Sequence, residues 1–474
     1  MMDDHRLLIG GKRVHGDSVI EVRNPYDDSL ITKAPSASEK QLHLAVEKAA
    51  AGFEKTRRMS TFERTSVMNN VITGIIARME GIARTITLEA GKPIKDSRVE
   101  VSRSVNTFGI AVEEAKRFGG ELIPLDTMPT TEGRWGITRR FPVGPVLAIS
   151  PFNFPLNLVV HKVAPAIAVG NPIIIKPSSA TPLTALTLGE ILVEAGYPKE
   201  AVSVVPCKGS AIETVLSDER MKKVSFTGSP AVGWRLKSLC GKMKITLELG
   251  GNAAVIIDDE ESLDYAIDRC VTGSFSFAGQ ICISVQRIIV REDLYDRFVR
   301  GFVEKSAALR MGNPLHETTE VGPMISAGAV AKAFNYTEQA VANGANVLLG
   351  GEVSGNMFPP TILENVPKDQ PAYCDEIFAP VVLLSKYNNF DEALVEVNDS
   401  EYGLQAGVFT SDLKKAWKAF ETLEVGGVMI GDIPTFRVDQ MPYGGVKNSG
   451  FGREGLIYAM EEMTELRLMM MNGL

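Results

Sequence analysis

The chain has 474 residues, of which 45% are hydrophobic and 23% are charged, with 50 basic residues against 58 acidic ones. This length exceeds what one hydrophobic core usually supports and suggests about three domains. The net charge of -8 offers no basic surface for nucleic acid or for an anionic membrane, and no apolar run reaches the ~18 residues that cross a bilayer.

The start of the chain and its cysteines indicate a reducing compartment. The first residues are acidic and lack the basic and apolar regions of a signal peptide. The five cysteines are widely spaced without a C-x-x-C pair, and the five histidines have no ligand spacing, so neither a disulfide framework nor a metal site is indicated. We therefore expect a cytoplasmic protein that binds no metal.

The first hundred residues are expected to form short strands and then helices. Strand-like pieces lie at 7–9 and 19–23. Two capping boxes, Ser38-x-x-Gln41 and Ser60-x-x-Glu63, predict the starts of the first two helices.

Two segments outside this pattern predict isolated strands. Residues 134–141 alternate their side chains between two faces and would suit a protruding ribbon. Residues 464–471 form an apolar strand near the end of the chain, which is an aggregation hazard unless something pairs with it. The strand either contributes to an interface or packs on its own domain.

From Gly144 onward, strands and helices alternate. Strands are predicted at 145–150, 172–175, 202–205 and 223–227, and a second such region runs from 253 to about 410. Alternation of this kind predicts a parallel sheet with helices on both faces. Ser229 and Pro230 begin a helix directly after a strand, which is a natural site for a phosphate.

One literal nucleotide-binding pattern is rejected. Residues 450–455 spell G-x-G-x-x-G, but no suitable strand precedes them and no acidic residue can follow ~20 positions later. We interpret this segment as a turn.

Seven short segments stand in a characteristic order. They are residues 150–155, 175–178, 226–233, 247–251, 279–282, 376–380 and 442–450. Each is weak alone, but together, over about 300 residues, they resemble the aldehyde dehydrogenase superfamily, and the resemblance covers nearly the whole chain.

The resemblance implies a fold and an assembly. It implies two doubly wound, Rossmann-like α/β domains with a small β oligomerisation arm. The cofactor-binding domain would comprise residues 1–122 and 144–252, the catalytic domain 253–455, and the arm 123–143 and 456–474. It further implies a homodimer or homotetramer.

Three catalytic residues follow from the resemblance, and their chemistry is coherent. The Cys282 thiolate would attack an aldehyde carbonyl, and the resulting oxyanion could expel hydride to a nicotinamide. The Asn153 amide and the Cys282 backbone N–H would stabilise that oxyanion. Glu248 would activate water to hydrolyse the thioester, which implies a free carboxylic acid as product rather than a coenzyme A ester.

Each of these residues also has an ordinary structural interpretation. A free cysteine usually behaves as a small buried hydrophobe. Glu248 could be a solvated acid at the end of a strand, and Asn153 could be a turn-forming amide.

The cofactor should be NADP or NAD. Lys176 would reach the adenosine ribose, and Ser179 stands where many NAD-preferring relatives carry Glu, so a 2′-phosphate would meet no repulsion. We therefore expect NADP to be accepted and mildly preferred. Ala379 departs from the family's usual Gly beside the nicotinamide ribose. The resemblance assigns cofactor contacts to Ser150, Pro151, Phe152, Lys176, Ser179, Phe226, Gly228, Ser229, Val232, Leu249, Gly250, Glu376 and Phe378.

The substrate should be a short polar aldehyde, hydroxylated or carrying one anionic group. Asn157 and His161, four residues apart on one helix face, would point towards the aldehyde entrance, and Arg437 falls in a segment that lines it. Alternatively, Arg437 is a surface salt-bridge residue. The full set of expected substrate contacts is Phe154, Asn157, His161, Ile281, Ile283 and Arg437.

Two other functions remain open from the sequence. The same fold could serve a cysteine-dependent esterase or thioester hydrolase that uses Cys282 and Glu248 without a redox step. It could also be a catalytically silent structural protein, although the three filled catalytic positions argue against that.

Overall fold

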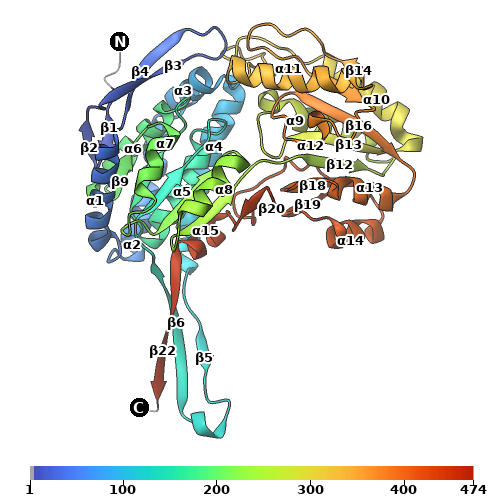
Figure 1. Ribbon diagram of the computed structural model, residues 1–474. Coiled ribbons are helices and arrows are strands. Elements are labelled where there is room, and N and C mark those ends of the chain that lie inside the picture. Colours follow the sequence, from blue (N-terminus) through green and yellow to red (C-terminus); the bar gives the residue numbers. More distant parts are fainter. Residues whose placement is uncertain (1–4, 473–474) are drawn as a thin grey trace.

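Two large sheets, each covered by helices, lie side by side, and a narrow arm extends from the first (Figure 1). The computed structural model describes residues 5–472. Within that range, no helix combines the length and hydropathy needed to span a bilayer.

The first sheet has five parallel strands at its centre and antiparallel strands at its edges. The strand order is β2 (Lys12–Val14), β1 (Leu7–Ile9), β9 (Val202–Val204), β8 (Ile173–Lys176), β7 (Val146–Ile149), β10 (Lys223–Thr227), β11 (Lys244–Glu248) and β21 (Gly450–Phe451).

The second sheet repeats this plan with six parallel strands and one antiparallel edge strand. Its order is β14 (Asn346–Leu349), β15 (Thr361–Glu364), β16 (Val381–Tyr387), β13 (Val285–Arg291), β12 (Ala253–Ile257), β18 (Gln405–Phe409) and β19 (Gly427–Ile430). The two doubly wound sheets confirm the predicted fold class.

Helices cover both sheets. Around the first sheet lie α1 (Glu39–Thr56), α2 (Thr61–Ala77), α3 (Met79–Ala90), α4 (Ile94–Arg117), α5 (Asn157–Val169), α6 (Leu183–Glu194), α7 (Gly209–Ile212), α8 (Pro230–Leu239) and α15 (Leu456–Glu462). Around the second lie α9 (Leu263–Phe275), α10 (Glu292–Ala307), α11 (Ala327–Ala342), α12 (Pro371–Cys374), α13 (Phe390–Asn398) and α14 (Leu413–Thr422). Both predicted capping boxes are formed, at Ser38 and Ser60.

Two of the small sheets have two strands each: a hairpin of β3 (Ser18–Arg23) and β4 (Leu30–Ser36), and a pair of β17 (Tyr402–Gly403) and β20 (Val446–Lys447).

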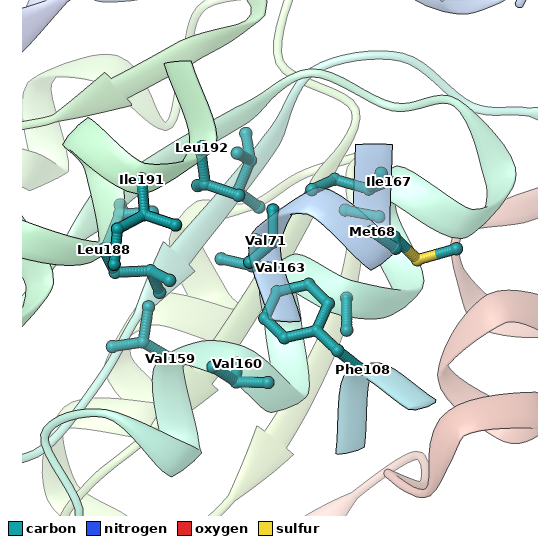
Figure 2. Packing of buried hydrophobic residues seen from close by; sticks show 14 of the residues in the cluster. Met68, Val71, Phe108, Val159, Val160, Val163, Ile167, Leu188, Ile191 and Leu192 are labelled. Carbon is teal, nitrogen blue, oxygen red and sulfur yellow. The ribbon is translucent and has the colours of Figure 1, made fainter. Parts of the chain in front are cut away.

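Helix α5 is the structural centre of the first unit, because every one of its residues is buried. Figure 2 shows Val160, Val163 and Ile167 of this helix packed with Val71 of α2 and Phe108 of α4. Each buried aliphatic side chain contributes roughly 1.5–3 kcal/mol. The packing therefore fixes the start of α5, where the predicted catalytic loop at 150–155 ends.

The arm is a three-stranded antiparallel sheet of β5 (Leu122–Pro124), β6 (Arg134–Pro142) and β22 (Thr464–Asn472) (Figure 1). Strand β22 thus pairs with β6 of its own chain, yet four large apolar side chains along it stay more than half exposed: Leu466, Leu468, Met469 and Met470.

Two structural observations bear on the predicted domain ranges. The chain passes from the first sheet to the second between β11 and β12, beside the expected boundary at 252–253. However, α15 packs against α5 and α4 through Leu456 and Met460, so this part of 456–474 lies in the first unit's core rather than in the arm. Residues 1–4 and 473–474 of these ranges lie outside the described residues.

The G-x-G-x-x-G segment at residues 450–455 begins with a short strand at the edge of the first sheet. Its first residues form β21, which runs antiparallel to β11 and places Gly450 opposite Glu248. A dinucleotide loop instead follows a strand that precedes the first glycine, so this segment lacks the required context.

Candidate active site

Cys282 lies between two cavities. One holds about 280 Å³, the other about 320 Å³, and both are lined by Cys282, Asn153 and Leu158. The turn before the cysteine is strained: Phe277 and Ala278 have φ of 47° and 52°. At Gly279 (φ +68°), a Cβ atom would lie 2.2 Å from the Ala379 carbonyl oxygen, so only glycine fits.

Asn153 reaches the nucleophile turn from the other half of the molecule. It follows β7 of the first sheet, is buried, and donates a hydrogen bond from Nδ2 to the main-chain oxygen of Gln280 at 2.9 Å. An amide nitrogen carries two hydrogens, so the second remains available for an oxyanion. The interpretation as an ordinary turn-forming amide does not account for this contact.

Glu248 ends strand β11 and is 2% exposed, so it is not a solvated acid. Neither carboxylate oxygen has a hydrogen-bond partner within residues 5–472. Burial raises the pKa of Glu248 well above its ordinary value, and the nearby negative charge of Glu454 raises it further. A buried carboxyl with an elevated pKa is suited to take a proton near neutral pH.

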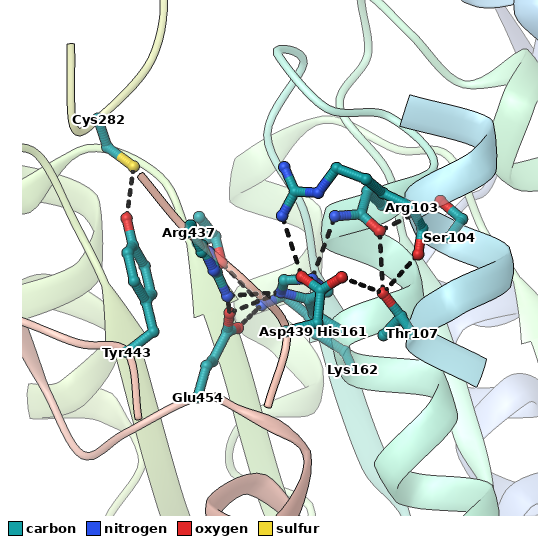
Figure 3. Close-up of polar contacts among 12 residues, drawn as sticks. Arg103, Ser104, Thr107, His161, Lys162, Cys282, Arg437, Asp439, Tyr443 and Glu454 are labelled. Atoms are coloured by element: carbon teal, nitrogen blue, oxygen red, sulfur yellow. Dashed lines mark hydrogen bonds and ion pairs between the residues drawn. The ribbon is translucent and has the colours of Figure 1, made fainter. Parts of the chain in front are cut away.

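The surroundings of the Cys282 thiol disfavour its ionisation. Burial raises the pKa of Cys282 to about 12, and the hydrogen bond from Tyr443 acts in the opposite direction. The Tyr443 hydroxyl lies 2.9 Å from Sγ (Figure 3). The negative charges of Glu376 and Glu248 raise this pKa further, and the positive charge of Arg437 lowers it.

The cavity of about 280 Å³ fits the predicted substrate side. Its lining includes five of the six expected substrate residues: Phe154, Asn157, Ile281, Ile283 and Arg437. His161 does not line it. The His161 ring lies buried, 3.0 Å from Asp439 and 3.1 Å from the Asn157 amide nitrogen (Figure 3). Asn157 and His161 therefore lie on one helix face as expected. However, their side chains contact each other, and they do not both point towards the entrance.

Arg437 is buried, with only 8% of its side chain exposed, so its interpretation as a surface salt-bridge residue is wrong. Its Nη2 lies 2.7 Å from His161 and 3.3 Å from Glu454. The guanidinium also stacks on the Tyr443 ring, 3.6 Å from the centroid. Its Nε atom has no hydrogen-bond partner among the described residues.

Sequence reasoning missed several further residues of this cavity, among them Lys92, Arg103 and Tyr443. Lys92 is fully buried, pairs with Glu100, and places its ammonium 3.7 Å from the centroid of the Phe154 ring. Lys92 and Arg103 lie on a segment far from any recognised motif, so no local signal marked them. Tyr443 stands inside the 442–450 segment and could have been identified there.

The cavity of about 320 Å³ contains much of the predicted cofactor site. Its lining includes Pro151, Phe152, Gly228, Ser229, Leu249, Gly250, Glu376 and Phe378. Helix α8 begins here, and Ser229 makes no side-chain capping bond, so backbone N–H groups at this helix start are available for a phosphate. These residues fit a dinucleotide cofactor.

The other predicted cofactor residues lie away from this lining. Ser150, with a buried hydroxyl, and Phe226 lie at or beside the ends of β7 and β10, while Val232 is 46% exposed on α8. Lys176 ends β8, and burial lowers its pKa. The Ser179 hydroxyl donates to the Cys207 carbonyl oxygen at 3.3 Å.

Glu376 lies at the junction of the two halves. Its Oε1 accepts a hydrogen bond from the Gly251 backbone N–H at 2.9 Å. Burial raises the pKa of Glu376 to about 7. Within residues 5–472, no cluster of His, Cys, Asp and Glu could hold a metal ion.

Comparison with known proteins settles the family. A model described as the aldehyde dehydrogenase family matches residues 13–469. The chain belongs to the aldehyde dehydrogenase family. It is 42% identical to 3-sulfolactaldehyde dehydrogenase of Priestia aryabhattai, covering 98% of both chains. It is 40% identical to aspartate-semialdehyde dehydrogenase 1 of Pseudomonas canavaninivorans, covering 96% of this chain and 97% of the relative.

Solved structures agree with this assignment. Aldehyde dehydrogenase 21 of Physcomitrella patens, in complex with the reaction product succinate, is 46% identical with a TM-score of 0.98, covering 100% of this chain and 99% of that one. This aldehyde dehydrogenase therefore oxidises a small aldehyde with a nicotinamide cofactor, and the hydrolase and silent-protein alternatives are not favoured.

Proposed function

We propose that this aldehyde dehydrogenase oxidises a short aldehyde with one anionic group to the carboxylic acid, and that it accepts NADP. The observation that carries the proposal is Arg437. Its guanidinium is buried in the cavity that opens on Cys282, and its Nε donor has no partner within the described part of the chain. A buried cation in the cavity lining favours a substrate with an anionic group, because interactions between charged partners are stronger than neutral ones.

Cavity size and charge support a small anion. Lys92, Arg103 and Arg437 contribute three cations to the lining, against the carboxylates of Asp96 and Glu100. A volume of about 280 Å³ is roughly that of nine liquid waters, so a chain of only a few carbons fits. The sulfolactaldehyde and aspartate-semialdehyde enzymes act, by their names, on anionic aldehydes, and the succinate in the Physcomitrella structure is an anionic product.

Each catalytic residue would perform one part of the reaction. The Cys282 sulfur forms a bond to the aldehyde carbon, and the carbonyl electron pair moves to oxygen. The free N–H of Asn153 and the backbone N–H of Cys282 hold that oxyanion. The nicotinamide cofactor, when bound, accepts the hydride. Glu248 then removes a proton from the water that cleaves the thioester.

NADP acceptance is supported by two observations. Ser179 carries no charge, so it would not repel a 2′-phosphate held by Lys176. A glyceraldehyde-3-phosphate dehydrogenase from Methanocaldococcus jannaschii, complexed with NADP, is 40% identical with a TM-score of 0.92 over 96% of this chain and 99% of that one.

We further infer a homodimer or homotetramer in the cytoplasm. The exposed apolar face of β22 would be covered by a second copy of the chain. All five cysteines are free thiols, which suits a reducing compartment.

A pair of matched aldehydes tests the proposed substrate class. Succinate semialdehyde and butanal have four carbons each and differ in the terminal carboxylate. One charge-assisted contact of about 1.5–3 kcal/mol predicts a kcat/KM ratio of ~10–150 in favour of the anionic aldehyde. Cys282→Ala serves as the blank, and both NADP and NAD are tested. Equal kcat/KM for the two aldehydes would refute the anionic assignment.

The variant Arg437→Met shows whether this arginine causes the preference. Its effect is measured as the ratio of the two kcat/KM values, because a general effect on the thiol cancels in that ratio. The ratio should fall towards one. If the ratio of the two kcat/KM values is unchanged in this variant, Lys92 or Arg103 rather than Arg437 recognises the anionic group.

A further inference from the structure

The contact between Tyr443 and Cys282 is not required by the steps above. Tyr443 is 2% exposed, and its hydroxyl lies 2.9 Å from Sγ of Cys282. The aromatic ring packs with Ile283 and Leu404. Phenylalanine would fill this apolar site equally well, so packing does not explain the hydroxyl.

The reacting sulfur needs a donor because its surroundings oppose the thiolate. Burial disfavours the charged form, and the carboxylates of Glu376 and Glu248 disfavour it further. Two groups act in the other direction: the hydrogen bond from Tyr443 and the positive charge of Arg437. Of these four groups, Tyr443 makes the hydrogen bond to the sulfur.

The direction of that hydrogen bond follows from chemistry. In the neutral thiol form either atom can donate. Once the thiol loses its proton, sulfur can only accept, so the Tyr443 O–H must be the donor. Hydrogen bonds to an ionised acceptor are roughly twice as strong as neutral ones, so the contact favours the thiolate over the thiol.

Arg437 acts on the same phenol from the other side. Its guanidinium lies 3.6 Å from the Tyr443 ring centroid (Figure 3). A cation over an aromatic face draws on the ring's electron density, which makes the phenol a stronger donor. Glu454 and His161 hold the guanidinium in place.

We propose that Tyr443 is a catalytic residue that favours the thiolate of Cys282 by donating its hydroxyl hydrogen to Sγ, and that Arg437 strengthens this donor by stacking on the ring. This inference rests on the proposed nucleophile, Cys282, but not on the identity of the aldehyde. It adds a fourth group to the predicted trio of Cys282, Asn153 and Glu248.

Tyr443→Phe tests the role of the hydroxyl, since it keeps the ring and the stacked arginine. The readout is alkylation of Cys282 by iodoacetamide between pH 6 and 10, without aldehyde or cofactor, followed by mass spectrometry of the Cys282 peptide. Only the thiolate reacts. The alkylation midpoint should rise by about one pH unit, which is read as a roughly tenfold lower rate at every pH on the rising part of the profile, pH 7 included.

The control is Tyr387→Phe, which removes another buried tyrosine hydroxyl, hydrogen-bonded to Asp258 at 2.7 Å. Its alkylation profile should match the wild type, and the thermal midpoints of both variants show that they are folded. A Tyr443→Phe enzyme with the wild-type alkylation midpoint would overturn the proposal.

A double-mutant cycle tests the part played by Arg437. Arg437→Gln should raise the alkylation midpoint in the wild-type background and have a smaller effect in the Tyr443→Phe background, because contacting residues that act together are non-additive. Equal shifts in both backgrounds would show that Arg437 acts on the sulfur directly and would remove it from the proposal.

These readouts remain separate from the substrate assignment. If succinate semialdehyde and butanal react equally well while the alkylation midpoint still shifts, the anionic substrate is wrong and Tyr443 keeps its role. If Cys282 is not the nucleophile, Cys282→Ala retains aldehyde oxidation, which contradicts both proposals together.

Discussion

The side-chain amide of Asn153 donates a hydrogen bond to the main-chain oxygen of Gln280 at 2.9 Å, although 127 positions separate the two residues. Asn153 belongs to the first sheet's unit, and Gln280 to the turn that carries the nucleophile in the second. The contact therefore sets the position of the proposed oxyanion donor relative to Cys282, and both cavities meet at this junction.

Replacing Asn153 by Ala should lower kcat by about 10²–10³-fold, which is the usual loss for one oxyanion donor. KM should change much less, because the stabilised charge develops only in the transition state. Steady-state kinetics with the preferred aldehyde measure both values. A loss below tenfold would show that the backbone N–H of Cys282 suffices alone.

Glu248→Gln should separate the two halves of the reaction. Acylation does not need the carboxylate, so a burst of reduced cofactor at 340 nm should persist in the first turnover. Steady-state turnover should fall by about 10²–10⁴-fold, because water is no longer activated, and mass spectrometry should detect an acylated Cys282 peptide. Loss of the burst itself would place Glu248 in the first half of the reaction instead.

The pH dependence of thioester hydrolysis should follow the elevated pKa of Glu248. Because burial and Glu454 raise this pKa, the active carboxylate is scarce at low pH and increases as the pH rises. Where hydrolysis limits turnover, kcat should rise about tenfold per pH unit below the pKa. A kcat profile that is flat from pH 5 to 8 would contradict this assignment.

Glu454→Gln should shift that profile to lower pH, since it removes the negative charge that raises the pKa of Glu248. The pKa of Glu454 itself is held well below its ordinary value by Lys162 and His161. The contribution of the Glu454 carboxylate to stability is therefore fully present above pH about 4.5, the ordinary pKa of a glutamate. This contribution is lost as the pH falls through the lower pKa of the folded state.

The same variant should also destabilise the fold. It leaves Lys162 buried beside a neutral amide, at a cost of ~3–5 kcal/mol. Chemical denaturation measures this loss. Glu200→Gln is the comparison and should cost little, because the side chains of Glu200 and its partner Lys55 are both exposed.

Ser179→Glu should convert the cofactor preference. A carboxylate near Lys176 would repel a 2′-phosphate by ~1–3 kcal/mol, so kcat/KM for NADP should fall roughly 5–150-fold while that for NAD changes little. Kinetics with both cofactors at constant aldehyde decide this. An NAD preference of a hundredfold in the unmodified enzyme would already contradict the expected acceptance of NADP.

The local features of the fold could be predicted from the sequence because they depend on near neighbours. The capping boxes at Ser38 and Ser60 need only residues three positions apart, and both are formed. The buried parallel strands were predicted for the same reason. The packing of helix α15 against α4 and α5 could not be predicted, because the apolar residues of a helix do not indicate which core will receive it.

At the active site, the sequence by itself determined the residue types: a cysteine, an amide and an acid in motifs whose order identifies the family. Tertiary structure alone decided their surroundings. The His161 ring contacts Asp439, and the Arg437 guanidinium lies buried over the Tyr443 ring. Lys92 lines the proposed substrate cavity although it belongs to an unrelated segment. Burial and pairing of charges depend on how distant segments meet, as His161 and Asp439 do across 278 positions, and no local pattern records which groups will come together.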